Sequence, residues 1–495
     1  MIPAVASRYN VFIPLSEGRK LGYNSFSGAE MILSVDDLRT YDKIIEEGGF
    51  DPQDEASVEL ARTGLVVPEG TDELALLEQE YYKARFNPHA ACLTIMTTSA
   101  CNFGCDYCFQ GADKPIDTMR EPVRDAIIAH IKSLEGRVNS LGIVWYGGEP
   151  LLRPEVIDDL STRIIALAPS LKMKFEAGIV TNGWHLDGAM AKRLHASKVG
   201  WAQVTLDGHR ESHDARRHLL GGQKTFDRLI DNLVEAVDTN TLRISLRVNI
   251  DARNRAGIFD LLDELYTRGL GGRSNFGVYF APVEAITEGC HNVADVTMSK
   301  EDYGHLEGEL YRYALQRRLT GAPYPRRFHG NCGAVRPRGM VITPTGDIHK
   351  CWDTISMPQY RVGTIFEPDK MLDDPIHQKW MAWTPFKNET CRNCKILPTC
   401  AGACAYKFVH ATHTRGEAAT LPCPSWKYNL DERLVATAAA HGAITKADLT
   451  EDTYSLKPSD LCTDDFRSGD ALPDNMTELL ATLSKNGHSR LPVIA

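Results

Sequence analysis

The chain has 495 residues, of which 43% are hydrophobic and 24% are charged, which is the composition of a soluble globular protein of about three domains. Its formal net charge of −10 argues against a nucleic acid or an anionic membrane surface as the main partner. No apolar run approaches the roughly 18 residues of a membrane-spanning helix, so none is expected.

The N-terminus and the cysteines together predict the compartment. Residues 1–8 lack a basic segment followed by an apolar one, so they do not match a secretory signal. The chain has 13 cysteines, an odd number, and most of them are grouped along the sequence. Such grouping, in a chain with no export signal, favours metal binding over disulfides in a reducing compartment. We therefore expect a cytoplasmic metalloprotein.

Residues 8–80 are predicted to form a small separate unit. Strand-like runs at 10–15 and 20–23 flank Ser16-Glu17-Gly18 and are expected to pair as a hairpin. Two helical patterns follow, at 35–46 and 55–63. This order is similar to that of the small winged domains that hold leader peptides of ribosomally made precursors. A structural cap over the next domain is the alternative, because a hairpin followed by helices is a weak pattern.

From residue 86 to residue 285 the chain alternates between strand and helix signals. Strands are predicted at 92–98, 142–146, 175–181, 201–206, 242–250 and 276–280, and helices between them at 121–134, 154–167, 188–197, 225–237 and 255–268. This alternation predicts an α/β fold with a parallel sheet and right-handed crossovers. Six units are too few for a closed eight-unit barrel, so we predict an open, partial (β/α)6 barrel whose chemistry lies at the carboxyl ends of the strands.

Three cysteines follow directly on the first of these strands. Cys101, Cys105 and Cys108 have the spacing CxxxCxxC, which lets one short loop bring three thiolates to three irons of a cluster. A 4Fe–4S cluster is normally held by four thiolates, so its fourth iron would stay open to a small molecule. A zinc loop is the alternative, since tetrahedral sulfur sites suit both zinc and iron–sulfur. However, no fourth ligand lies nearby, and structural zinc sites usually pair two such elements.

This motif, with Tyr107 just before its last cysteine, resembles that of the radical S-adenosylmethionine (radical SAM) family. The resemblance covers about residues 90–285. It implies that the amine and carboxylate of S-adenosylmethionine chelate the free iron. It also implies that one electron from the reduced cluster cleaves the sulfonium, and that a 5′-deoxyadenosyl radical then abstracts hydrogen from the substrate.

The segment after the second predicted strand, Gly147-Gly148-Glu149-Pro150, resembles the GGEP motif of the same family. Two glycines let the backbone approach a ligand closely. The resemblance implies that exposed carbonyls of this segment accept hydrogen bonds from the methionyl ammonium.

Further S-adenosylmethionine contacts are implied at the ends of later strands. Thr205 and Asp207 stand in a segment that resembles the family's motif after strand four, where Thr205 would contact the methionyl carboxylate with Asp207 nearby. Arg217 matches an HDxxR pattern and would pair with that carboxylate, the alternative being an exposed loop arginine. Asn182 and Asn249 would hydrogen-bond the ribose or the amino acid, or else satisfy local turn backbone.

A second group of cysteines follows a predicted linker, residues 286–330, that carries a helix near 300–319. Cys332 is followed after thirteen residues by Gly346 and after four more by Cys351. The remaining members of the group are Cys391, Cys394, Cys400, Cys404 and Cys423. This order closely matches the SPASM extension of radical SAM enzymes. A zinc ribbon from four of these cysteines is the alternative, but it leaves the other three unexplained.

The SPASM resemblance implies two auxiliary 4Fe–4S clusters. Cys332, Cys351 and Cys404 would hold the first cluster, and Cys391, Cys394, Cys400 and Cys423 would hold the second. The fourth ligand of the first cluster is left open between Cys290, His329 and a substrate group on an open iron. Cys290 is otherwise a buried apolar thiol, and we expect Cys92 to be a core residue and Cys462 to be incidental.

The segment after Cys351 contains a candidate general base. Sulfatase-maturating relatives carry an aspartate directly after the equivalent cysteine, whereas here Trp352 takes that position and Asp353 follows it. We take Asp353 as the candidate catalytic residue, and the departure weakens a formylglycine-forming function.

These expectations give five ranges and one function. The ranges are 1–85 for a winged-helix-like domain, 86–285 for the barrel, 286–330 for the linker, 331–425 for the SPASM domain and 426–495 for a helical tail. The resemblance implies an oxidoreductase that crosslinks a precursor peptide through a thioether, C–C or C–O bond. It would use S-adenosylmethionine, three 4Fe–4S clusters and a flavodoxin- or ferredoxin-type electron donor. A formylglycine-forming enzyme and a non-catalytic electron carrier are the alternatives.

Overall fold

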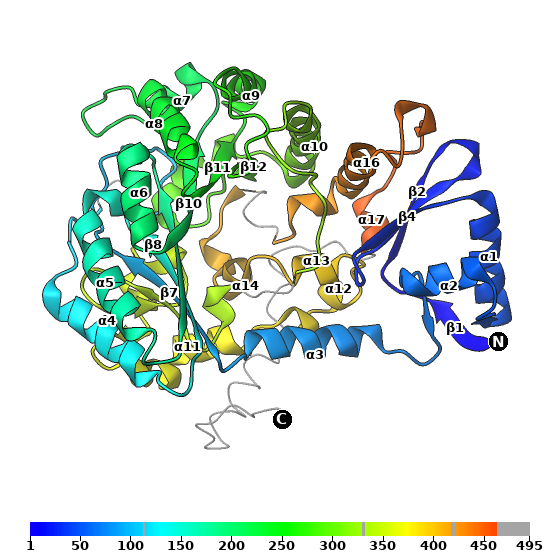
Figure 1. The fold of residues 1–495 in the computed structure, drawn as a ribbon, viewed down its shortest axis with the longest axis horizontal. Coiled ribbons are helices and arrows are strands. Elements are labelled where there is room, and N and C mark those ends of the chain that lie inside the picture. Colours follow the sequence, from blue (N-terminus) through cyan, green and yellow to red (C-terminus); the bar gives the residue numbers. More distant parts are fainter. Residues whose placement is uncertain (112–113, 329–331, 417–421, 463–495) are drawn as a thin grey trace.

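The computed structural model describes residues 1–111, 114–328, 332–416 and 422–462. Figure 1 shows an elongated molecule, with the strand-and-helix barrel at one end and the N-terminal unit at the other. Among the described residues, none of the helices combines the length and the apolar character needed to cross a membrane.

The N-terminal unit contains the predicted hairpin. Its strands are β2 (Asn10–Pro14), β3 (Lys20–Asn24) and β4 (Ala29–Leu33), which form an antiparallel sheet in that order. The predicted helices are present as α1 (Val35–Glu47), which a capping box of Ser34 and Asp37 begins, and α2 (Glu55–Arg62). A second small sheet, in the order β5-β1-β6, was not predicted; its strands are β1 (Ile2–Ala6), β5 (Gly49–Phe50) and β6 (Val66–Pro68).

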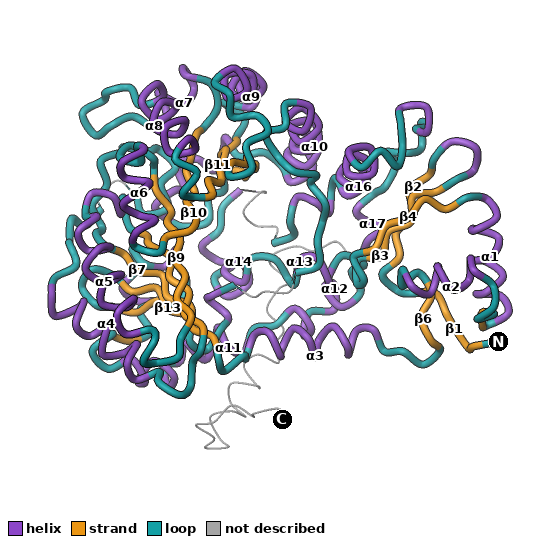
Figure 2. Tube along the Cα trace, in the orientation of Figure 1, coloured by secondary structure: helices purple, strands orange, loops and turns teal. Residues whose placement is uncertain are grey.

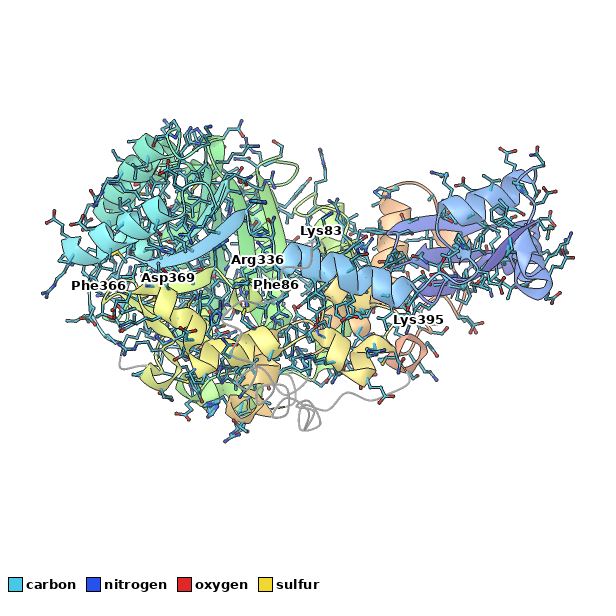
Figure 3. The ribbon with its side chains drawn as sticks, turned by 90° about the horizontal axis from the view of Figure 1, so that it is seen from below. Lys83, Phe86, Arg336, Phe366, Asp369 and Lys395 are labelled. Carbon is cyan, nitrogen blue, oxygen red and sulfur yellow. The ribbon has the colours of Figure 1, made fainter. Side chains whose placement is uncertain are left out.

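Helix α3 (Glu73–Arg85) connects this unit to the rest of the molecule and was also missed. In Figure 3, Lys83 and Phe86 mark its barrel end and Lys395 lies near its other end. At the barrel end, Arg85 is 1% exposed and donates to the carbonyls of Val335 and Trp383 at 2.8 and 2.6 Å. These bonds satisfy a buried guanidinium, so they fix the helix end to the cysteine-rich region.

The barrel has the six predicted strands, all parallel and adjacent in chain order. They are β7 (Ala90–Met96), β8 (Ser140–Tyr146), β9 (Lys174–Thr181), β10 (Val199–Leu206), β11 (Arg243–Ile250) and β12 (Phe276–Pro282). The helices are α4 (Glu121–Ser133), α5 (Pro154–Leu167), α6 (Gly188–Ala196), α7 (Arg210–Arg216), α8 (Phe226–Asp238) and α9 (Ile258–Thr267). Figure 2 shows α4, α5 and α6 outside the strands. Apolar side chains of strands and helices form one large core between the two layers. The predicted partial barrel is confirmed.

Within the described residues the sheet nevertheless has nine strands, because the cysteine-rich region adds three to it. Strand β13 (Gly339–Ile342) runs parallel to β7, with Gly339 opposite Cys92, and β14 (Asp347–His349) and β15 (Gly363–Thr364) continue the sheet antiparallel. The barrel and the second cysteine group therefore share one continuous sheet.

The remaining helices are short, apart from α10 and α16. They are α10 (Lys300–Gln316), α11 (Pro375–Ala382), α12 (Glu389–Arg392), α13 (Leu397–Cys400), α14 (Ala405–Val409), α16 (Leu430–Ala440) and α17 (Pro458–Leu461). Helix α16 packs on the N-terminal hairpin, where Leu434 joins Val11 and Ile13 in one buried cluster. The part of the predicted tail beyond residue 462 lies outside the described residues.

Candidate active site

The first cysteine loop begins at the carboxyl end of β7, where the barrel opens. Cys101, Cys105 and Cys108 all lie on it as free thiols. Burial, against the opposing charge of Arg217 and together with Asp207, Cys101 and Cys108, raises the pKa of the Cys105 thiol to about 11. Three thiols this close repel as thiolates, and a bound cation removes that cost by replacing their protons.

The described residues contain no three His, Cys, Asp or Glu side chains that converge on one metal-ion position. A four-iron cluster makes a different demand, because each thiolate binds a different iron. A single loop of three neighbouring thiols meets that demand, so the residues present fit the cluster.

The GGEP segment packs directly against this loop. The backbone N–H of Gly148 donates to the Thr98 carbonyl at 3.0 Å, and that of Glu149 donates to the Ala100 carbonyl at 2.9 Å. Gly147 has a φ of +150°, and a Cβ built on Gly148 would lie 2.3 Å from the Ala100 oxygen. The glycines are thus needed for the close approach of two backbones, as predicted, but the partner seen here is the cysteine loop itself.

Replacing Gly148 by alanine is expected to push the cysteine loop away and to lower iron by about four atoms per chain after anaerobic reconstitution. The matched control is Gly142→Ala in β8, where a Cβ comes no closer than 4.0 Å to the Ala91 carbonyl oxygen. Iron and sulfide analysis measures both variants. Unchanged iron in the Gly148 variant would show that the loop tolerates the displacement.

Glu149 ties the ends of two strands together. Its carboxylate is 1% exposed and accepts from the Thr181 hydroxyl and the Asn182 backbone N–H, both at 2.7 Å. The Asn182 amide in turn donates to the side-chain oxygen of Asn102, inside the cysteine loop, at 2.8 Å. Pro150 contributes its carbonyl, which accepts from the Thr97 hydroxyl at 3.1 Å. These residues hold the cysteine loop in place, and their contact with S-adenosylmethionine stays a prediction.

Tyr107, Arg217 and Asn249 meet at one hydroxyl. Arg217 Nη1 donates to the Tyr107 oxygen at 2.6 Å, and Asn249 Nδ2 donates to it at 3.1 Å. Arg217 is 7% exposed, so the alternative of an exposed loop arginine is wrong. Burial disfavours its charge, but Cys105, Tyr107 and Asp207 outweigh that effect and raise its pKa. The structure therefore keeps a cation beside the cysteine loop.

If Arg217 pairs with the methionyl carboxylate, Arg217→Ala removes a charge-assisted hydrogen bond of about 1.5–3 kcal/mol. The KM for S-adenosylmethionine is then expected to rise roughly 10- to 100-fold. Arg210→Ala is the control, because Arg210 lies on the same helix, α7, and pairs outward with Asp227. The rate of 5′-deoxyadenosine formation reports both. An unchanged KM in the Arg217 variant would remove the assignment.

Thr205 and Asp207 lie at the end of β10, as predicted, and both are buried. Neither carboxylate oxygen of Asp207 has a hydrogen-bond partner among the described residues. The nearest cation is Arg216, 3.7 Å away, which also pairs with Asp251 at 3.1 Å. Orphaned buried oxygens fit a ligand that donates hydrogen bonds. Sequence reasoning missed Arg216 and Asp251, although Arg216 stands beside Arg217 in the same motif.

Cys332, Cys351, Cys404 and Asp353 form a second centre. Burial raises the pKa of the Cys351 thiol, and the nearby Asp353, Cys332 and Cys404 raise it further. The Cys351 Sγ donates to a carboxylate oxygen of Asp353 at 3.4 Å. Asp353 is 8% exposed, and burial raises the pKa of its carboxyl to about 6. The three thiols thus lie near one another, with Asp353 beside Cys351, and their sharing of one cluster stays a prediction.

Cys290 lies in a small apolar cluster with Val283 and Val293. Its Sγ donates to the carbonyls of Thr287 and Glu284 at 3.3 and 3.7 Å. These contacts are typical of a buried thiol with a structural role. Ligation of the first auxiliary cluster by Cys290 stays a prediction. His329, the other protein ligand considered, lies outside the described residues.

An aromatic pair lies between the two centres and was not predicted. Tyr146, at the end of β8, stacks on Trp352 with ring centroids 5.3 Å apart and an angle of 15°. Burial raises the pKa of Tyr146, and the nearby Asp353 and Cys108 raise it further, so Tyr146 is close to both cysteine centres. Trp352 is 42% exposed. It therefore presents an aromatic face beside the candidate base.

The third centre is formed by Cys391, Cys394, Cys400 and Cys423 around α12 and α13. Burial raises the pKa of the Cys400 thiol to about 12, and the nearby Cys423 raises it further. Cys462 lies in the same centre, with its Sγ donating to the Thr390 carbonyl at 3.2 Å. The expectation that Cys462 is incidental is thus not supported by its position.

Comparison with known proteins identifies the barrel. Residues 95–252 match the sequence model of the radical SAM superfamily. The chain carries a radical SAM domain. A Fe-coproporphyrin III synthase of Methanosarcina barkeri is 32% identical over 170 residues, which are 34% of this chain and 39% of that protein. A probable GTP 3′,8-cyclase of Saccharolobus solfataricus is 25% identical over 179 residues, or 36% of this chain and 54% of that one. The chain thus spans about half, or less, of the curated relatives it matches.

A solved structure shares the fold over a longer stretch. The structure of anSMEcpe with bound AdoMet (S-adenosylmethionine) aligns with a TM-score of 0.56 at 17% identity, covering 73% of this chain and 97% of that one. Together with the family match, this supports a radical SAM fold that continues beyond the barrel. A 4Fe–4S cluster and S-adenosylmethionine are the cofactors that a radical SAM domain implies.

Proposed function

We propose that this protein is a radical SAM oxidoreductase that crosslinks a ribosomally made peptide after hydrogen abstraction. The observation that carries the proposal is the position of the second cysteine centre. The Tyr146 ring lies near that of Phe109, which follows Cys108, and stacks on that of Trp352, which stands between Cys351 and Asp353, so a substrate at the barrel mouth would meet both centres. An electron carrier needs neither the GGEP segment nor a candidate base at that place.

Each set of residues has a task in this proposal. When bound, the clusters supply the electron that cleaves S-adenosylmethionine and an acceptor for the second electron of the oxidation. Cys101, Cys105 and Cys108 would hold the first of them. Arg217 and Asn249, joined through the Tyr107 hydroxyl, would orient S-adenosylmethionine. The Asp353 carboxylate would take the proton that the oxidised substrate loses, and Trp352 would face the substrate.

A peptide substrate is supported by the shared fold. The anSMEcpe structure was also solved with AdoMet and the Cp18Cys peptide, at a TM-score of 0.55 and 17% identity. A protein of similar fold can thus bind a peptide. Formylglycine formation is less well supported, because Trp352 stands directly after Cys351. We further propose that residues 1–85 hold the leader segment, that residues 331–425 bind two auxiliary clusters and that a flavodoxin- or ferredoxin-type protein donates the electron.

The test uses the full chain, reconstituted and reduced under anaerobic conditions. Incubation with S-adenosylmethionine is expected to yield 5′-deoxyadenosine, measured by liquid chromatography and mass spectrometry. Short peptides encoded beside the gene are then added, and a product lighter by two hydrogens is expected. Absence of 5′-deoxyadenosine would favour the electron carrier. If S-adenosylmethionine is cleaved but the peptides stay unmodified, the radical chemistry would stand and those peptides would be excluded as substrates.

A further inference from the structure

We propose that Cys462 is a fifth thiol of the second auxiliary cluster site, placed to replace Cys394 as an iron ligand. The inference rests on the part of the proposed function that assigns this cluster to Cys391, Cys394, Cys400 and Cys423. The family pattern ends at Cys423, so neither the motif nor the comparisons assign a role to Cys462.

Two hydrogen bonds hold residues 461 and 462 against both sides of the Cys391–Cys394 turn. The Leu461 carbonyl accepts from the Lys395 backbone N–H at 2.8 Å, on the far side of Cys394. The Cys462 Sγ donates to the Thr390 carbonyl at 3.2 Å, on the near side of Cys391. In Figure 3, Lys395 marks this region, near the end of α3 that faces the N-terminal unit. Cys462 thus has a fixed position relative to the turn that carries two of the expected ligands.

Cys394 and Cys462 pack in one buried cluster of side chains. Both residues are buried, at 9% and 4% exposure. Ile396 and Leu434 surround them in the same apolar cluster. Water therefore does not compete for this position, and an iron atom that Cys394 releases would have the Cys462 sulfur as its nearest replacement.

Cys462 also lies close to other members of the centre. Its Sγ donates to the carbonyl of Thr390, the residue before Cys391, and Cys391 itself packs in one apolar cluster with Cys423 and in another with Cys400. Cys462 is therefore a fifth thiol beside the turn that carries the expected ligands. A single apolar cysteine in a tail needs no such neighbours.

The exchange between the two cysteines balances without an outside reagent. The bond between iron and the Cys394 sulfur would break, and a bond between iron and the Cys462 sulfur would form. The proton of the Cys462 thiol would pass to the Cys394 sulfur. No electron is gained or lost, so the cluster keeps its charge and its number of thiolate ligands.

The experiment compares iron and sulfide content and the electron paramagnetic resonance spectra of full-length variants after anaerobic reconstitution. The wild type is expected to hold about twelve iron atoms, and Cys394→Ala is expected to keep about twelve because Cys462 takes over. The double variant Cys394→Ala/Cys462→Ala is expected to hold about eight. The control is Cys400→Ala, also expected to hold about eight, because Cys400 packs in a different apolar cluster from Cys394 and Cys462.

Two outcomes overturn the inference. If Cys394→Ala alone falls to about eight atoms with the barrel cluster intact, or if the double variant keeps about twelve as Cys394→Ala does, Cys462 is not the replacement ligand. A wild type with about eight atoms would instead refute the second auxiliary cluster itself, which separates the two failures.

A second measurement covers the case in which the Cys394 variant does not fold. Loss of iron from Cys462→Ala to a chelator is expected to be roughly tenfold faster than from the wild type, since no replacement thiol recaptures the iron. Cys92→Ala, in strand β7, is the control and is expected to match the wild type. A rate equal to that of the wild type in the Cys462 variant would count against the inference.

Discussion

Replacing Cys105 by alanine is expected to abolish 5′-deoxyadenosine formation and to lower iron from about twelve to about eight atoms per chain. With two thiolates left on the loop, the cluster loses the ligand set that leaves one iron open. Burial and its neighbours hold the pKa of this thiol near 11, so only a bound metal makes it a thiolate at neutral pH. Iron analysis and a product assay on reduced protein measure the two effects.

The matched control is Cys92→Ala, because Cys92 is a cysteine of the preceding strand that no cluster assignment includes. This variant is expected to keep both iron and 5′-deoxyadenosine formation. Full S-adenosylmethionine cleavage by the Cys105 variant would show that the loop does not carry the chemistry. Loss of activity in both variants would point to a folding defect, which circular dichroism would detect.

Replacing Asp353 by alanine is expected to remove the crosslinked product and to leave 5′-deoxyadenosine formation intact. The carboxyl is buried beside Cys351, whereas S-adenosylmethionine would bind at the loop of Cys101, Cys105 and Cys108. Hydrogen abstraction therefore does not need it, whereas proton removal from the oxidised substrate does. Loss of a positioned base typically costs about 10²- to 10⁴-fold in rate, which mass spectrometry of the peptide product would show.

Two comparisons make this result specific. Asp353→Asn keeps the shape of the side chain without its basicity, so it is expected to behave like the alanine variant. Asp369→Ala removes an exposed carboxylate of the same region and is expected to be neutral (Figure 3). Normal product formation by Asp353→Ala would remove the residue from the mechanism, and loss of 5′-deoxyadenosine as well would indicate a structural role.

The sequence alone determined the barrel and its contents. Buried parallel strands leave apolar runs, and each of the six is followed by a helix with its own amphipathic pattern, so local signals located β7 to β12 closely. Cysteine spacing is equally local, since the loop of Cys101, Cys105 and Cys108 needs only neighbouring residues to form. The hairpin of β2 and β3 was predictable for the same reason, because a short turn joins its strands.

Tertiary structure decided the contacts between distant segments. The pairing of β13 with β7, the anchoring of α3 by Arg85 and the stacking of Tyr146 on Trp352 each join residues far apart in the chain. Such contacts follow from packing and burial, which leave no periodic pattern in either partner. The same holds for Arg216 and Asp251, whose ion pair forms only in the folded barrel.

Cys462 is the clearest example of this difference. By sequence it is a single thiol thirty-nine residues beyond the last cysteine of the motif. In the fold, the tail packs on the N-terminal hairpin, and this packing brings Cys462 close to Cys394. Local spacing determined which cysteines can share a loop, whereas the burial of apolar surface by remote segments decided which of them share a site.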